Sequence, residues 1–500
     1  MVQPRTALAA PAPEASADVP TEGLRAVVGL DLRSLAALRI GLGAALLFDL
    51  ATRCRDLTAH YTDQGVLPAH LARQLFGPYS LHLWAHTAWG VGLLFALGMA
   101  AAAALMVGWH TRLATWVSFV LLVSLQHRNP MVGDFGDQTA RVLLLWALFL
   151  PLGARASLDR SRARTAQGPN WLVSLATAAW VLQILIVYCS AAAHKAQHPA
   201  WYLGRELWYV LNLEKNARVH AHLLLAYPRV CEALTWGTLG MELLAPLVLL
   251  VPRKVQRNRA ALALAFAGLH LGFFAFIRLG VFTLYSLLLW VPLVPGELWG
   301  RAGRWVLARA GAGRAEAASR SPEPTWAMRP LEKLAVVTLL AATEFTILAG
   351  LTPHAALAEA LAVPMGVVGV DQAWTMYDDR STTDGWWVAP AELANGARVD
   401  LVTERPVDLA KPADVGDRYG DQRWTDYLID ISHVDVSYLA PGYANVLCRR
   451  WNARHAAGDA ARTVSLVFMR EETGISSVDA PVKDERLKRW TCPAAQVAAR

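Results

Sequence analysis

The chain has 500 residues, of which 55% are hydrophobic, and a formal net charge of +7. Soluble domains are usually only about 45–50% apolar, so this composition argues against a wholly soluble protein. The apolar residues come in runs of roughly 18–22, the length that crosses about 30 Å of hydrocarbon as a helix. Basic residues flanking such runs account for the charge without nucleic acid, and the five cysteines lack the spacing of a structural metal site.

Residues 1–30 are rich in Ala and Pro and contain no uninterrupted apolar core, so we expect a disordered cytoplasmic tail, not a cleavable signal peptide. Residues 31–350 contain nine apolar stretches. We expect them to form an all-α polytopic membrane bundle of about nine transmembrane helices. The stretches lie near 33–51, 86–107, 112–126, 138–152, 171–190, 230–252, 260–277, 280–296 and 331–350.

Basic residues gather in alternate loops of this bundle. They occur in GARASLDRSRART after the fourth stretch, in PRKVQRNRA after the sixth, and between 301 and 320 after the eighth. Loops rich in Lys and Arg stay on the cytoplasmic side of a membrane. The pattern therefore predicts a multi-pass protein of the inner (plasma) membrane, with a cytoplasmic N-terminus and an extracytoplasmic C-terminal region.

Residues 351–500 have the patterns of a smaller α+β extracytoplasmic domain. GWWVAPAEL and ARVDLVT are typical of strands, and Asn395-Gly396 between them is a strong hairpin signal. TVSLVFMRE predicts a further strand, and SYLAPGYANVLCRRWNARH includes a predicted helix. Cys448 and Cys492 lie on the oxidising side, where a disulfide and two free thiols are equally compatible with the sequence.

Lys195, in YCSAAAHKAQHPAWYLGRELW at the end of the fifth stretch, is the most informative ionisable residue. It could anchor the helix by extending its ammonium group to the membrane surface. Alternatively it is a desolvated base, because burial disfavours the charged form of an amine. The small residues 190–193 favour this reading, since they let a flat ligand or another helix approach closely.

Other polar residues in the apolar stretches have both structural and functional interpretations. His270 is either a core histidine or a catalytic one, and Arg39 and Glu242 suggest a structural ion pair. Two pairs have the i, i+4 spacing that can chelate a metal: His82 with His86, and His194 with His198. Exposed histidines at the membrane interface are the more common explanation, so we expect no metal site.

Several segments together resemble the HTTM (horizontally transferred transmembrane domain) family, the bacterial relatives of vitamin K-dependent γ-glutamyl carboxylase. The similarity covers most of residues 30–450. It is carried by LAALRIGLGAALL, YTDQGVLP, RNPMVGDFGDQTARVLLLWALFLPLGARASLDR, QAWTMYDD, NGARVDL and QRWTDYL, by Lys195 followed by Trp201 and Gly204, and by His270 followed by Gly280-Val281-Phe282.

The resemblance implies a reaction in which the lysine matching Lys195 deprotonates a reduced quinone similar to vitamin K. Oxygen then adds, and the strong base so formed removes a proton from glutamate so that CO₂ can add. His270 matches a histidine that supports this chemistry. The place of another functional histidine is held by Gly136-Asp137, and we expect Asp137 to orient Lys195. We assign ligand binding to His194, Trp201, Arg128 and Tyr188.

The predicted partners are the lipid bilayer, a quinol, and an extracytoplasmic peptide or protein, but no nucleic acid. Two other classes of protein remain open. In the first, the chain is a non-catalytic, membrane-anchored binding or assembly protein, as suggested by the size of the outer domain and its tryptophans: Trp374, Trp386, Trp387 and Trp424. In the second, it is a metal or haem redox protein that uses the histidine pairs.

Overall fold

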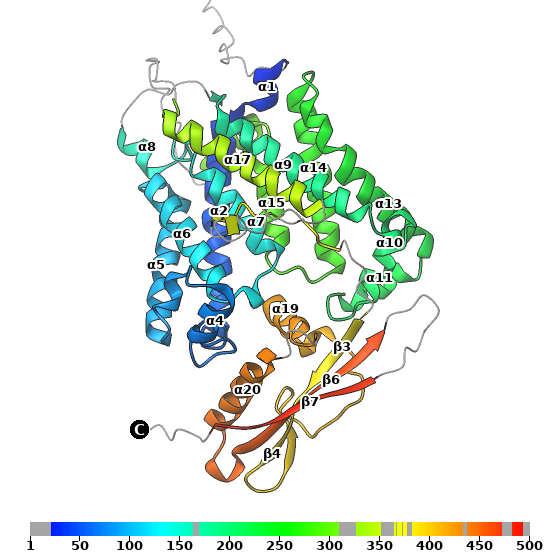
Figure 1. Ribbon diagram of the computed structural model, residues 1–500. Helices are drawn as coiled ribbons and strands as arrows, with labels where there is room; N and C mark the ends of the chain where they lie inside the picture. Colours follow the sequence, from blue (N-terminus) through cyan, green and yellow to red (C-terminus); the bar gives the residue numbers. More distant parts are fainter. Residues whose placement is uncertain are drawn as a thin grey trace, which may run out of the picture.

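The chain forms a helical bundle with a small β-sheet in its C-terminal part, as the computed structural model shows (Figure 1). The structure describes residues 22–163, 170–309, 327–351, 365–377 except 367 and 373, 383–433, 438–472 and 483–493. Most of the predicted tail lies outside these residues. Its last part is described and includes the short helix α1 (Leu24–Val28).

A helix occupies each of the nine predicted stretches. These helices are α2 (Leu32–Arg53), α5 (Ala88–Val107), α6 (Thr111–Arg128), α7 (Phe135–Ala147), α9 (Leu175–Lys195), α13 (Pro228–Leu244), α14 (Val255–Phe276), α15 (Phe282–Trp290) and α17 (Pro330–Leu351). By length and composition, five described helical segments could cross a membrane, or six if a bent pair counts as one span. The five lie at Leu32–Tyr61, Ala88–Val107, Leu175–Lys195, Pro228–Leu250 and Val255–Phe276.

Shorter helices connect these elements. They are α3 (Leu57–Tyr61), α4 (Ala69–Phe76), α8 (Leu158–Ala163), α10 (Pro199–Tyr202), α11 (Glu206–Asn212), α12 (His222–Leu225) and α16 (Gly296–Arg309). Single 3-10 turns include η2 (Leu81–Leu83), η3 (Pro130–Val132), η4 (Val219–Ala221), η5 (Pro246–Leu250) and η6 (Val291–Leu293).

The segments next to the predicted basic loops meet at one end of the bundle. There β1 (Leu30–Asp31) pairs antiparallel with β2 (Trp171–Leu172), and the Gly23 amide donates to the Pro252 carbonyl at 2.9 Å. The C-terminal domain lies at the opposite end (Figure 1). The described segments that flank the basic loops therefore lie together, as the alternation in the sequence predicts.

The C-terminal sheet is antiparallel and built around one long strand. Its strands are β3 (Thr383–Val388), β4 (Pro390–Leu393), β5 (Arg398–Asp400), β6 (Ala461–Glu472) and β7 (Lys483–Thr491). β6 pairs with β3 and β4, and also with β7. The predicted hairpin is confirmed: β4 pairs with β5, and Gly396 takes φ +86°, a conformation that glycine adopts without steric cost.

Two helices accompany this sheet, α19 (Gln422–Asp430) and α20 (Ala440–Arg454), and α20 confirms the predicted helix. α20 packs on β6, whereas α19 packs against η3 at the end of the bundle. Cys448 and Cys492 form a disulfide that ties α20 to the end of β7. One hydrophobic core runs from the domain into the bundle and contains both Trp387 and Phe95.

Candidate functional site

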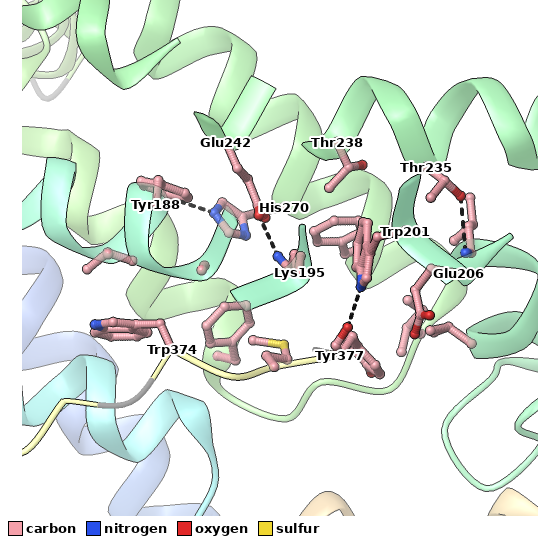
Figure 2. A pocket seen from close by; sticks show the side chains of 18 residues that line it. Tyr188, Lys195, Trp201, Glu206, Thr235, Thr238, Glu242, His270, Trp374 and Tyr377 are labelled. Atoms are coloured by element: carbon pink, nitrogen blue, oxygen red, sulfur yellow. Dashed lines mark hydrogen bonds and ion pairs between the residues drawn. The ribbon is translucent and has the colours of Figure 1, made fainter. Parts of the chain in front are cut away.

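A cavity lies where α9, α13, α14 and α15 meet the short helices α10 and α11 (Figure 2). Its volume is about 70 Å³. A buried water needs roughly 10–15 Å³ on this measure, so the void has space for a few waters or one ring-sized group. Most of its wall is apolar, and a few polar side chains converge on it, as in typical small-molecule sites.

Lys195 and Glu242 form an ion pair in the wall of this cavity, with Nζ and Oε2 2.5 Å apart (Figure 2). Lys195 is 6% exposed and Glu242 4% exposed. Lys195 ends α9, and the chain then makes the short helices α10, α11 and α12 before α13 turns back along the bundle. This detour brings Glu242, in the second half of α13, level with the end of α9.

Trp201 covers the amine of Lys195. Its indole ring lies 5.0 Å from Lys195 Nζ, a cation–π geometry, and its Nε1 donates to the backbone carbonyl of Tyr377. Tyr377 belongs to the segment that leads from the bundle to the C-terminal sheet. The six-residue spacing between Lys195 and Trp201 thus places the two side chains in contact. The hydrogen bond from Trp201 to Tyr377 links the site to the C-terminal part of the chain.

His270 presents a free nitrogen to the cavity. Trp290 Nε1 donates to the Tyr188 hydroxyl at 2.9 Å, and that hydroxyl lies 2.8 Å from His270 Nε2 (Figure 2). His270 Nε2 is the one described acceptor for the hydroxyl proton of Tyr188, so the neutral ring carries its own proton on Nδ1. Nδ1 is buried without a hydrogen-bond partner among the described residues. The site therefore offers an N–H donor to a ligand oxygen.

Aromatic and aliphatic side chains close the rest of the cavity. Phe273 comes from α14 and Ile277 follows this helix directly, whereas Phe282 comes from α15. Trp374 and Met376 come from the segment after α17. They keep bulk water from the charged pair, and electrostatic interactions are stronger in such surroundings.

Four predicted site residues line this cavity, and three do not. Lys195, His270, Trp201 and Tyr188 come together as described above. His194 is half-buried outside the cavity wall. Arg128 is fully buried elsewhere, where its Nη1 donates to the Leu67 carbonyl at 2.8 Å.

Asp137 has other partners than Lys195. It pairs with Arg53 of α2 and with Arg423 of α19, the latter at 2.8 Å. Arg423 also reaches Asp49 at 2.8 Å. The residue that holds Lys195 is Glu242. Asp137 instead belongs to a buried charge network between the bundle and the C-terminal domain.

The predicted ion pair of Arg39 with Glu242 is wrong. Arg39 donates to the carbonyls of Leu105 and Met106 in the last turn of α5, at 2.9 and 2.7 Å. Carbonyls at a helix C-terminus lack partners within the helix and attract cations. The sequence shows Glu242 as a lone carboxylate in an apolar stretch, which marks it as unusual. It does not show that Glu242 lies at the same height along the bundle as Lys195.

Of the four paired histidines, one differs from the interpretation as exposed residues, and His194 and His198 are half-buried. His82 is buried, with Nδ1 2.7 Å from the Ser124 hydroxyl, whereas His86 is exposed. Within the described part of the chain, no three His, Cys, Asp or Glu residues are placed to hold a metal ion.

Comparisons of the chain with models of protein families, with curated proteins and with solved structures find no match.

Proposed function

We propose that the chain is an integral membrane enzyme that removes a proton from the hydroxyl of an apolar ring compound, such as a reduced quinone, as the first step of carboxylase-type chemistry. The observation that carries this proposal is the buried Lys195–Glu242 pair beside the free Nδ1–H of His270. Ionisable groups that line a cavity in apolar surroundings often mark a functional site.

A membrane location is supported by the outward faces of the helices. Trp89 and Leu93 of α5 are 91% and 72% exposed, and this helix is apolar all round, as expected beside lipid. We propose nine crossings of the inner membrane, with the basic loops in the cytoplasm. The disulfide between Cys448 and Cys492 supports an oxidising compartment for the C-terminal domain.

The acid–base unit is the pair, not the lysine alone. Glu242, whose Oε2 lies 2.5 Å from Lys195 Nζ, accepts one proton from the ligand hydroxyl on behalf of the pair. The Lys195 ammonium and the His270 Nδ1–H then stabilise the negative charge left on the ligand oxygen. The pair changes from neutral to one positive charge as the ligand becomes an anion, so charge is conserved in a dry site.

The cavity residues suit the ring of a reduced quinone. The apolar wall of Phe273, Phe282 and Trp374 would hold the ring, and His270 and Lys195 would hold its oxygen. When bound, such a compound would react with O₂, and this reaction would provide the driving force for the addition of CO₂ that the resemblance implies.

The test is turnover of reduced quinones by the purified full chain in lipid nanodiscs, measured as loss of the reduced form under O₂ and CO₂. Lys195→Met, Glu242→Gln and the double variant should each lose at least about 100-fold, the usual contribution of positioned acid–base groups. Lys333→Ala, an exposed lysine of α17, is the matched control and should keep full activity. Equal rates in all variants, or no turnover by the native protein with any quinone, would overturn the proposal.

The non-catalytic alternative has less support. Its motive was the aromatic content of the outer domain, but all four tryptophans are buried: Trp374, Trp386, Trp387 and Trp424. They fill hydrophobic cores and offer no exposed aromatic surface to a partner. If the native protein shows no turnover, the non-catalytic binding or assembly protein becomes the favoured class.

A further inference from the structure

A second, larger cavity of about 440 Å³ lies between the C-terminal domain and the end of the bundle. It adjoins the first cavity, because Phe282, Met376 and Tyr377 line both. A molecule bound in the second cavity would therefore touch the same residues as a ligand in the first.

One face of α19 supplies the polar wall of this cavity. Gln422, Asp426 and Asp430 follow one another at intervals of four residues, which places them on the same side of the helix. The bundle contributes Asp134, just before α7, and Asn216. The wall thus carries three carboxyl groups, and no Lys, Arg or His is among the described residues that line it.

Nearby cations attract the carboxylates of this wall but are shared with carboxylates outside it. Arg423 of α19 pairs with Asp49 and Asp137, and Lys215 is attracted to Asp384 as well as to Asp426. Among the described residues, Asp134, Asp426 and Asp430 form no ion pair within 4.0 Å.

The same wall contains buried acceptor oxygens that lack donors. Gln422 Nε2 donates to Asp426 Oδ1 at 2.9 Å, which turns Gln422 Oε1 the other way. Gln422 Oε1, Asp426 Oδ2 and Asn216 Oδ1 are each buried without a hydrogen-bond partner within the described part of the chain. Buried acceptors without donors are costly, so three of them around one cavity indicate a ligand rich in N–H groups.

We propose that this cavity is a binding site for an organic cation, a guanidinium or ammonium group on a carbon stem. The N–H groups of such a ligand match the carboxyl groups and the unpaired oxygens. Phe135, Phe282 and Tyr377 supply aromatic surface for the stem and for cation–π contact. A bare metal ion fits less well, because the described carboxyl groups do not converge on a single point.

This site does not depend on the proposed function, since it is defined by binding alone. If both hold, the cationic group belongs to the second substrate and positions it beside the first cavity. A glutamate side chain would be repelled from this wall, so the group held here differs from the glutamate that the family resemblance implies.

The experiment measures binding of N-acetyl-arginine amide to the purified full chain in nanodiscs by calorimetry. N-acetyl-citrulline amide has the same shape without charge and should bind at least about 10-fold more weakly, and N-acetyl-glutamate amide should not bind. Asp426→Asn and Asp430→Asn should each weaken arginine-amide binding about 10-fold or more, as expected for loss of one partner of a charge pair. Asp408→Asn, an exposed acid on the same domain, is the matched control.

Equal binding of the citrulline and arginine compounds would overturn the proposal, as would unchanged affinity in both cavity variants. Displacement of the arginine compound by Mg²⁺ or Ca²⁺ at micromolar concentration would show a metal site instead. If Asp426→Asn does not fold, Asp430→Asn, nearer the C-terminal end of α19, decides the question. Binding of arginine amide is measured without any quinone, so failure here is distinguishable from failure of the catalytic proposal.

Discussion

The buried pair of Lys195 and Glu242 affects stability differently from an ion pair on the surface. Each would be costly to bury alone, and their attraction offsets this cost only while both are present. The pair therefore contributes little to net stability compared with an apolar pair of similar size. Its retention in an apolar cavity is better explained by a function in proton transfer.

Substitutions of Lys195 and Glu242 should be strongly non-additive in a double-mutant cycle. Lys195→Met leaves Glu242 buried without a partner and should lower the free energy of unfolding by about 3–5 kcal/mol. Glu242→Gln should be similarly harmful. The double variant removes both charges and should recover most of the loss. Thermal unfolding in detergent measures the three variants, and additive losses would show that the two side chains do not form a pair.

Binding in the acidic cavity should depend on pH. Burial raises the pKa of Asp134 and of Asp430 to about 6, and it raises that of Asp426 well above its usual value. The charges of Asp137 and Asp49 also raise the pKa of Asp134, while Arg423 lowers it. The charges of Asp134 and Asp430 raise the pKa of Asp426 in the same way. A cationic ligand favours the ionised carboxylates.

Affinity for N-acetyl-arginine amide should therefore rise by about 10-fold or more between pH 5 and pH 7.5 as Asp134 and Asp430 ionise, since each pKa unit is worth about 1.4 kcal/mol. Asp430→Asn should flatten this rise, because one of the titrating groups is gone. Calorimetry across this range measures it. An affinity that is constant, or that falls with pH, would contradict the charge assignment.

At the scale of single elements, α19 decides how the C-terminal domain meets the bundle. Arg423 inserts between α2 and α7, where it donates to Asp49 and Asp137 and to the Val132 carbonyl at 2.9 Å. Arg53 completes the network by pairing with the same two carboxylates. The burial of the network raises the energetic importance of every member, because no water can replace a lost partner.

Arg423→Ala should consequently destabilise the protein by about 3–5 kcal/mol, since two buried carboxylates would share one cation. Arg454→Ala, which removes an exposed pair with Glu404, is the comparison and should cost only about 0–1 kcal/mol. Thermal unfolding with limited proteolysis of the C-terminal domain is the measurement. Equal effects of the two substitutions would mean that α19 is not held by this network.

At the scale of the whole molecule, the two ends of the bundle differ in chemistry. One end gathers the segments beside the basic loops, and the other carries the C-terminal sheet (Figure 1). The disulfide belongs to the C-terminal domain, and the second cavity lies where this domain meets the bundle. Such an asymmetry is expected when the ends face different compartments.

Cysteine labelling tests this orientation in intact cells. In a background with Cys54, Cys189 and Cys231 changed to Ser, Asp408→Cys should react with an impermeant maleimide, whereas Arg257→Cys should react only after permeabilisation. Both positions are exposed, so access decides the result. Labelling of Arg257→Cys alone in intact cells would reverse the proposed topology.

The local features of this fold follow from the sequence because they depend on neighbouring residues. Long apolar runs give helices at all nine predicted stretches, and Asn395-Gly396 turns the chain into the hairpin of β4 and β5. Four of the predicted site residues also share a cavity, in part because Tyr188 and Lys195 lie on one helix and Trp201 follows directly.

Only the tertiary structure decided which charges meet. Glu242 pairs with Lys195 and not with Arg39, and Asp137 pairs with Arg423, a residue nearly three hundred positions away (|i−j| = 286). Such contacts depend on the relative level and rotation of packed helices, which small changes in a connecting segment can shift. Local sequence patterns predict the helices but not their alignment. The acidic cavity forms because α19 packs against the end of the bundle.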